Sequence, residues 1–91
     1  MKFPKGMLVE ITAGKYKGLV MTVVDTDGIS VFVADGRHRK LEKTKKLNPK
    51  HIKVLEGLLS PEDLKLLENG MLTNRALWKI LVTNVRLDRK D

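Results

Sequence analysis

The sequence contains no cysteine, only four aromatic residues and no long apolar run. Without cysteine the chain forms neither a disulfide nor a thiolate metal site, so an apolar core must stabilise the fold. No stretch approaches the roughly 18 apolar residues that cross a bilayer, and the opening MKFPKGMLVEI meets Glu10 too early for a secretory signal. We therefore expect a cytoplasmic protein of one domain.

The sequence also lacks a catalytic or metal-binding constellation. A nucleophile needs a base and an orienting group beside it, and the best-placed serine, Ser60, is better explained as a helix cap. His38 and His51 are thirteen residues apart, without a third ligand at metal-binding spacing. Turn formation explains the acids at predicted strand ends, which are Asp25, Asp27 and Asp35. We expect no enzymatic activity, no metal and no cofactor.

One segment has very few acids and many bases. Residues 37–53, RHRKLEKTKKLNPKHIK, hold eight of the eighteen Lys and Arg residues beside a single acid, Glu42. Their net charge of +7 equals that of the whole chain, because the bases and acids of residues 1–36 and 54–91 cancel. Leucine and isoleucine interrupt the segment, which indicates folded structure rather than a charged disordered tail.

The N-terminal half has the pattern of short strands. Apolar side chains alternate in 7–12 and 29–34, and 19–25 is rich in β-branched residues. Asp27-Gly28 and Asp35-Gly36 favour tight turns. We predict five strands, with the fourth at 37–43 beside the third, and with Ile52 and Val54 pointing inward from a fifth at 51–55. This pattern suggests a small SH3-like barrel.

The C-terminal third predicts two helices. SPEDLKLLENG starts with Ser60 as N-cap and Pro61 at the first position, and it ends at Asn69-Gly70. TNRALWKILVTNVRL predicts a second helix capped by Thr73 or Asn74, with Trp78 as its large anchor. Its apolar stripe comprises Leu77, Ile80, Leu81 and Val85.

The helices have a surface to cover, because the predicted strands at 19–25 and 29–34 are apolar on both faces. We therefore predict a mostly β fold with C-terminal helices. A barrel over residues 1–55 carries a helical hairpin over residues 56–91, packed as one domain.

A glycine-bounded loop, AGKYKG at 13–18, presents Lys15, Tyr16 and Lys17 between the first two strands. Glycine permits close approach to a phosphate, lysine neutralises it, and an aromatic ring can stack on an unpaired base. The alternative is a solvated hairpin in which Tyr16 packs sideways on the barrel. The loop alone does not decide between them.

The cations of 37–53 repel one another unless a polyanion lies nearby, which favours nucleic acid as the partner. A cationic face kept for solubility is the alternative, but solubility needs no such segregation of charge. We predict that RNA contacts the following residues: Lys15, Tyr16, Lys17, Arg37, His38, Arg39, Lys40, Lys43, Lys45, Lys46, Lys50, His51 and Lys53.

GMLVEITAGKYKGLVMTVVD followed by ISVFVADGRHRKLEKTKKLNPKHI resembles the bacterial KOW-domain proteins that are similar to ribosomal protein fourteen-e of the archaeal and eukaryotic large subunit. The resemblance implies an SH3-like barrel that binds RNA or docks in the transcription and translation machinery. It also implies that Lys15, Tyr16 and Lys17 form the KOW loop and that residues 37–53 form a basic wall against RNA. The later ALWKILVTNVRLDRK is more apolar than such tails, which leaves a protein contact near Trp78 open.

These features together predict a non-enzymatic RNA-binding protein associated with the ribosome or with structured ribosomal RNA. With so few aromatics, RNA shape and backbone should dominate recognition. A protein-interaction module acting through the C-terminal helices is the first alternative. An anionic membrane is disfavoured because the basic cluster has no accompanying apolar face, and double-stranded DNA because no predicted recognition helix carries the cations.

Overall fold

The computed structural model of the chain describes the backbone of residues 3–88 and the side chains of residues 3–84. Its strands form one antiparallel sheet in the order β4-β3-β2-β1-β5. The elements in chain order are β1 (Met7–Ile11), β2 (Val20–Thr26), β3 (Val31–Ala34), the 3-10 helix η1 (Leu41–Lys43), β4 (Lys45–Leu47), the 3-10 helix η2 (Pro49–His51), β5 (Ile52–Leu58), α1 (Pro61–Glu68) and α2 (Asn74–Asp88).

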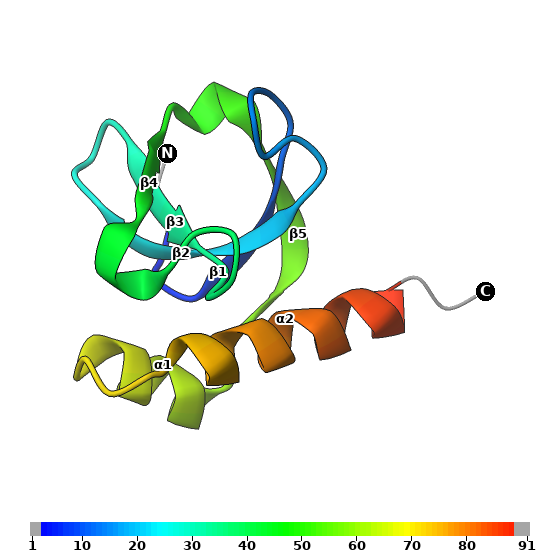
Figure 1. Ribbon diagram of the computed structural model, residues 1–91. Coiled ribbons are helices and arrows are strands. Elements are labelled where there is room, and N and C mark those ends of the chain that lie inside the picture. Colours follow the sequence, from blue (N-terminus) through cyan, green and yellow to red (C-terminus); the bar gives the residue numbers. More distant parts are fainter. Residues whose placement is uncertain (1–2, 89–91) are drawn as a thin grey trace.

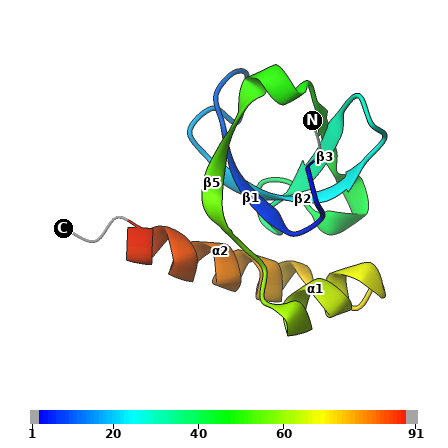
Figure 2. The same cartoon turned by 180° about the vertical axis from the view of Figure 1, so that it is seen from behind.

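The sheet is strongly curled, and both helices lie against its outer face (Figures 1 and 2). The edge strands β4 and β5 face each other across the curl and are linked by η2 (Figure 1). This arrangement confirms a mostly β fold with C-terminal helices. Within residues 3–88, no helix has the length and apolar character that crossing a membrane requires.

Alternation along β2 divides the apolar residues into two layers. Met21 and Val23 are fully buried inside the curl, where they join Val9, Ile11, Val31 and Val33. Val20 and Val24 point to the opposite face and pack with the helices. The helices contribute Leu77 and Leu81, which are also fully buried, and burial of each such side chain stabilises the fold by about 1.5–3 kcal/mol. The prediction that the helices cover the second face is therefore confirmed.

The helix boundaries follow from side-chain caps. The Ser60 hydroxyl accepts a hydrogen bond from the backbone N–H of Asp63 (3.1 Å), as predicted. For α2, the Thr73 hydroxyl accepts from the Ala76 N–H (3.1 Å), so Thr73 supplies the cap and leaves the Asn74 side chain available for other bonds. Of the predicted stripe, Leu77 and Leu81 are buried, Ile80 is partly buried, and the Val85 side chain lies outside the described residues.

The predicted fourth strand at 37–43 is wrong. Residues 35–40 form a turn, which we call the Asp35 turn, and η1 follows it. The Asp35 carboxylate accepts hydrogen bonds from the backbone N–H groups of Arg37 and Arg39 (2.9 Å each), so neither donor is available for a strand ladder. Pairing with β3 resumes only in β4, where Lys45 lies opposite Val33.

The third strand begins at Val31, two residues later than predicted. Asp27 Oδ1 accepts from the N–H groups of Ile29 (2.9 Å) and Ser30 (2.6 Å), which makes residues 27–30 a turn and leaves the Ile29 side chain exposed. Backbone hydrogen bonds from Ser30 and Ile29 lower the pKa of Asp27.

Val54 lies opposite the buried Val9, which places it on the inner side of the sheet as predicted, but on the edge strand β5 it remains 48% exposed. Val9 pairs with Val54, whereas Met7 pairs with Leu58, so β5 contains a bulge between the two pairs. Gly57 lies within the bulge at φ 125°. Ile52, before the bulge, packs against the inner layer as predicted.

Candidate nucleic-acid interface

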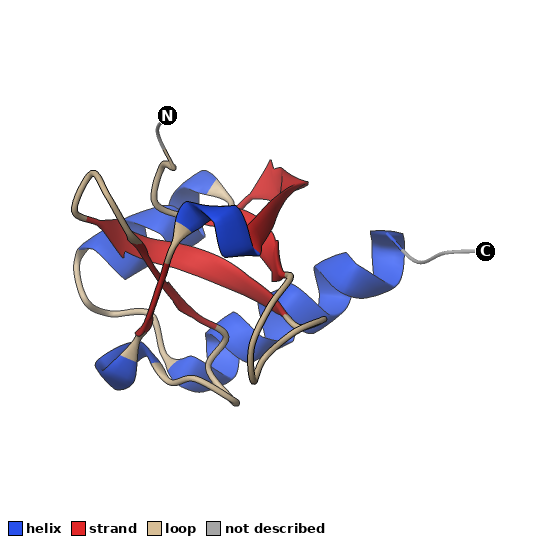
Figure 3. Cartoon of the chain, turned by 90° about the horizontal axis from the view of Figure 1, so that it is seen from above, coloured by secondary structure: helices blue, strands red, loops and turns tan. Residues whose placement is uncertain are grey.

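Three segments lie together on the side of the curled sheet that is remote from the helices (Figures 1 and 3). They are the loop between β1 and β2, the strand β4, and the 3-10 helix η2. The Thr12 N–H donates to the His51 carbonyl (2.9 Å), which ties the loop to η2. Together the segments surround a cavity of about 360 Å³, which we call the loop hollow. It is lined by Ile11, Ala13, Gly14, Lys15, Tyr16, Lys45, Lys46, Leu47, Asn48 and His51.

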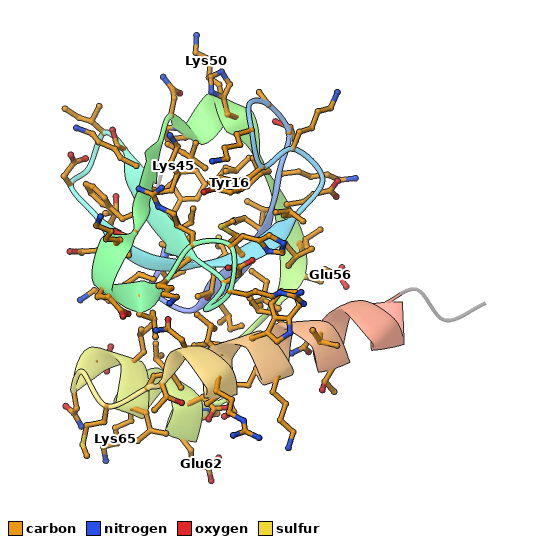
Figure 4. The ribbon with its side chains drawn as sticks, viewed as in Figure 1. Tyr16, Lys45, Lys50, Glu56, Glu62 and Lys65 are labelled. Carbon is orange, nitrogen blue, oxygen red and sulfur yellow. The ribbon has the colours of Figure 1, made fainter. Side chains whose placement is uncertain are left out.

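The loop hollow joins two parts of the prediction that are distant in the sequence. Lys15 and Tyr16 come from the glycine-bounded loop, whereas Lys45, Lys46 and His51 come from the basic segment. Figure 4 shows Tyr16 and Lys45 close together in the mouth of the curl. The hollow therefore combines an apolar floor with cationic and hydrogen-bonding groups, a combination that suits a nucleotide.

Tyr16 packs on the sheet and lines the hollow at the same time. Its half-buried ring contacts the inner apolar layer, and its hydroxyl donates a long hydrogen bond to the His38 carbonyl (3.4 Å). Lys15 Nζ lies 5.5 Å from the ring centroid. Tyr16 therefore packs against the sheet, as the alternative prediction had it, and lines the hollow as well.

The Asp35 turn is organised by a buried carboxylate. The side chain of Asp35 is 1% exposed, and its Oδ2 lies 2.8 Å from His38 Nδ1. Within residues 3–84, this contact is the only pairing of a basic side chain with a carboxylate. The prediction named His38 only as a residue that contacts RNA. In the structure its ring also contacts Asp35 and meets the Trp78 ring edge-on.

Arg39 is also partly buried. Its Nη2 donates to the Thr44 carbonyl (3.4 Å), and its Nε has no hydrogen-bond partner among the described residues. Arg37 is exposed, and its guanidinium carbon lies 5.2 Å from the Trp78 ring centroid. Arg37 and Arg39 therefore differ in role: Arg37 presents a guanidinium at the surface, whereas Arg39 helps to shape the turn.

Trp78 belongs to this site and not to the core. It is half-buried and lies in neither buried apolar cluster, so the prediction of a large core anchor is wrong. Leu77 and Leu81 fill the space beneath α2 instead.

The remaining predicted cations are exposed or half-buried, and none pairs with a carboxylate within residues 3–84. Lys50 points away from the helices (Figure 4). Lys53 stands apart from the others on the edge strand β5, where its backbone register places it opposite Glu10. The lysines without such a cross-strand acid are Lys15, Lys17, Lys40, Lys43, Lys45, Lys46 and Lys50.

No protein-family model matches this chain, and no curated protein matches it. Within residues 3–84, no three side chains of His, Asp or Glu are grouped to hold a metal ion. The features of this chain that bear on function are therefore the cations, the loop hollow and the Asp35 turn.

Proposed function

We propose that this chain is a non-enzymatic cytoplasmic RNA-binding protein whose curled sheet is a small SH3-like barrel of the KOW type. Five short antiparallel strands in the order β4-β3-β2-β1-β5, with the edge strands linked by η2, support this fold. The loop at 13–18 would be the KOW loop, in keeping with the sequence resemblance. The barrel would comprise β1 to β5, so that it ends at Leu58 and not at residue 55 as predicted, and the C-terminal helices would extend the same domain.

The observation that carries the proposal is the meeting of the glycine-bounded loop with the basic segment around the loop hollow. Lys15, Lys45 and Lys46 line one small cavity without a carboxylate partner among the described residues. Holding like charges together is unfavourable in the free protein and becomes favourable when phosphates lie between them. An RNA backbone across the hollow would neutralise these lysines.

The hollow also favours RNA with unpaired nucleotides over a continuous duplex. Its floor contains Ile11, Leu47 and the ring of Tyr16, on which an extruded base would rest while lysines hold the adjoining phosphates. Structured RNA offers such bases in loops and bulges. With the resemblance to ribosomal proteins, this makes ribosomal RNA or the ribosome the partner we propose.

A salt titration tests the proposal. If the surface engages about five to eight phosphates, a plot of log affinity against log salt should fall with a slope of roughly −4 to −7. Filter binding with a structured RNA, and competition by a DNA duplex of equal length, measure this slope and the preference for RNA. A flat salt response, or equal competition by the duplex, would contradict the proposal.

A second candidate function is protein interaction in the translation or transcription machinery. The apolar stripe of α2, which first suggested it, is buried on the sheet. Another surface supports it: Met71 is 68% exposed beside a cavity of about 380 Å³. The cavity is lined by Val24, Leu41, Glu42, Leu67, Gly70 and Leu72. A partner that stays bound after nuclease treatment and in high salt, and is lost in Met71→Lys, would favour this function.

A further inference from the structure

The first turn of α2 packs directly against the backbone of the Asp35 turn. A Cβ atom placed on Gly36 would lie 2.2 Å from the carbonyl oxygen of Asn74, so only glycine permits this approach. The Asn74 side chain then bonds the next residues of the basic segment. Its Oδ1 accepts from the Leu41 N–H (2.7 Å), and its Nδ2 donates to the Glu42 carboxylate (2.8 Å).

One helical turn further along α2, Trp78 contacts the tip of the same turn. The His38 ring meets the indole edge-on, with 5.6 Å between the ring centroids. The Arg37 guanidinium lies over the indole at 5.2 Å, a distance at which cation and ring attract each other. Asn74 therefore contacts the Asp35 turn at its base and Trp78 contacts it at its tip, and the two contacts together restrict the position of the turn.

These contacts are not needed to build the core or to start the helix. Neither Asn74 nor Trp78 belongs to a buried apolar cluster, and Thr73 already caps α2. What they fix is the path of residues 36–42, which carry Arg37, Arg39 and Lys40. In a free loop, these side chains would lose conformational entropy when RNA binds.

We infer that Asn74 and Trp78 are positioning residues of the RNA-binding surface, which α2 completes by holding the Asp35 turn before RNA arrives. This inference rests on the proposed function. It assigns the C-terminal helix a part in RNA binding, although the helix itself need not touch RNA. The Arg37 side chain then loses its conformational entropy when the protein folds rather than when RNA binds.

A double-mutant cycle on RNA affinity tests this inference. Trp78→Leu keeps apolar cover but removes the ring, and it should weaken binding to a structured RNA by about three- to tenfold. In an Arg37→Gln background the same change should cost at most about twofold, because the guanidinium that Trp78 positions is already gone. Trp78→Phe, which restores an aromatic face, should recover most of the affinity. A purely structural effect would weaken both backgrounds equally.

Asn74→Ala provides a second variant that leaves the indole in place, and circular dichroism verifies that each variant is folded. The control is Thr83→Ala, since the Thr83 hydroxyl donates to the Lys79 carbonyl within α2 and makes no other hydrogen bond among residues 3–84. This control should bind RNA as the unaltered chain does. Equal losses from Trp78→Leu in both backgrounds, or no loss from either Trp78→Leu or Asn74→Ala, would overturn the inference.

Lys45→Gln combined with Lys46→Gln, measured in the same assay, separates the two proposals. If this pair loses affinity while the α2 variants do not, the proposed function survives and only the positioning role fails. If the unaltered chain shows no salt-dependent RNA binding, both proposals are overturned.

Discussion

At the scale of single residues, Asp35 is the group on which the shape of the basic surface depends most. It is a buried carboxylate that accepts from two backbone N–H groups and contacts His38. Asp35→Ala should lower the free energy of unfolding by about 2–3 kcal/mol, because it leaves those donors without an acceptor. Asp35→Asn keeps one acceptor oxygen and should cost less. Urea denaturation measures both, and equal losses would contradict this account of the turn.

Gly36 and Gly28 form a matched pair for testing the close approach to α2. Both have positive φ, at 84° and 89°, but a Cβ on Gly28 would meet nothing within 4 Å. Gly28→Ala should therefore cost only the conformational strain, about 1–2 kcal/mol. Gly36→Ala should cost a further 1–3 kcal/mol or so, because the new methyl group would strike the Asn74 backbone. Similar losses in urea denaturation would show that the approach is not tight.

Glu42 links the stability of the basic segment to pH. The hydrogen bond from Asn74 is the main cause that lowers the pKa of Glu42. Because the pKa is lower in the folded state, the charged carboxylate stabilises the fold above the unfolded pKa of about 4.3 and this contribution disappears as pH falls through the folded pKa. Glu42→Gln should flatten the part of a stability-against-pH curve that lies around and below this unfolded pKa. An unchanged curve in Glu42→Gln would contradict this link between Glu42 and stability.

At the scale of secondary-structure elements, the contact between α2 and the sheet should dominate the stability contributed by the C-terminal third. Leu81 is fully buried on α2, whereas Leu66 on α1 is 39% exposed. Leu81→Ala should lower the unfolding free energy by about 2–5 kcal/mol, since it leaves a cavity between helix and sheet. Leu66→Ala, the same chemical change, should cost about 1 kcal/mol or less. Thermal and urea unfolding would reveal comparable losses if the helix were only loosely attached.

Elements specified by local signals were the ones that sequence reasoning predicted well. Period-two alternation placed the first strand, enrichment in β-branched residues placed the second, and the Ser60 cap placed α1. The fourth strand was misplaced because the Asp35 carboxylate accepts from backbone N–H groups that a strand would use. The residue types of 37–43 do not reveal that competition. The bulge in β5 likewise depends on its register with β1.

The candidate site was predictable as a set of residues but not as a geometry. The glycine-bounded loop and the basic segment were both named from the sequence, yet their meeting around the loop hollow depends on the curl of the sheet. Trp78 was assigned to the core because size and hydrophobicity normally favour burial there. Trp78 contacts Arg37 and His38, which lie about forty residues earlier in the chain. The periodicity of apolar residues within one helix does not predict such a contact.

At the scale of the whole molecule, the proposed function depends on where charge lies rather than on how much charge there is. The molecule extends 36 × 27 × 23 Å, well beyond the screening length of about 8 Å at physiological salt. Lysines at the helical end, such as Lys65 (Figure 4), are therefore screened from a polyanion bound at the loop hollow.

Two double variants that remove the same charge separate location from net charge. Lys45→Gln with Lys46→Gln should weaken RNA binding by roughly tenfold or more and reduce the salt slope by about two, because each lysine that neutralises a phosphate releases about one counterion. Lys65→Gln with Lys79→Gln, on the helices, should change the affinity by about twofold or less and leave the slope unaltered, since only long-range attraction is reduced. Filter binding across a salt series measures both. If the two pairs lose affinity equally, RNA is attracted by net charge alone and the loop hollow is not its site.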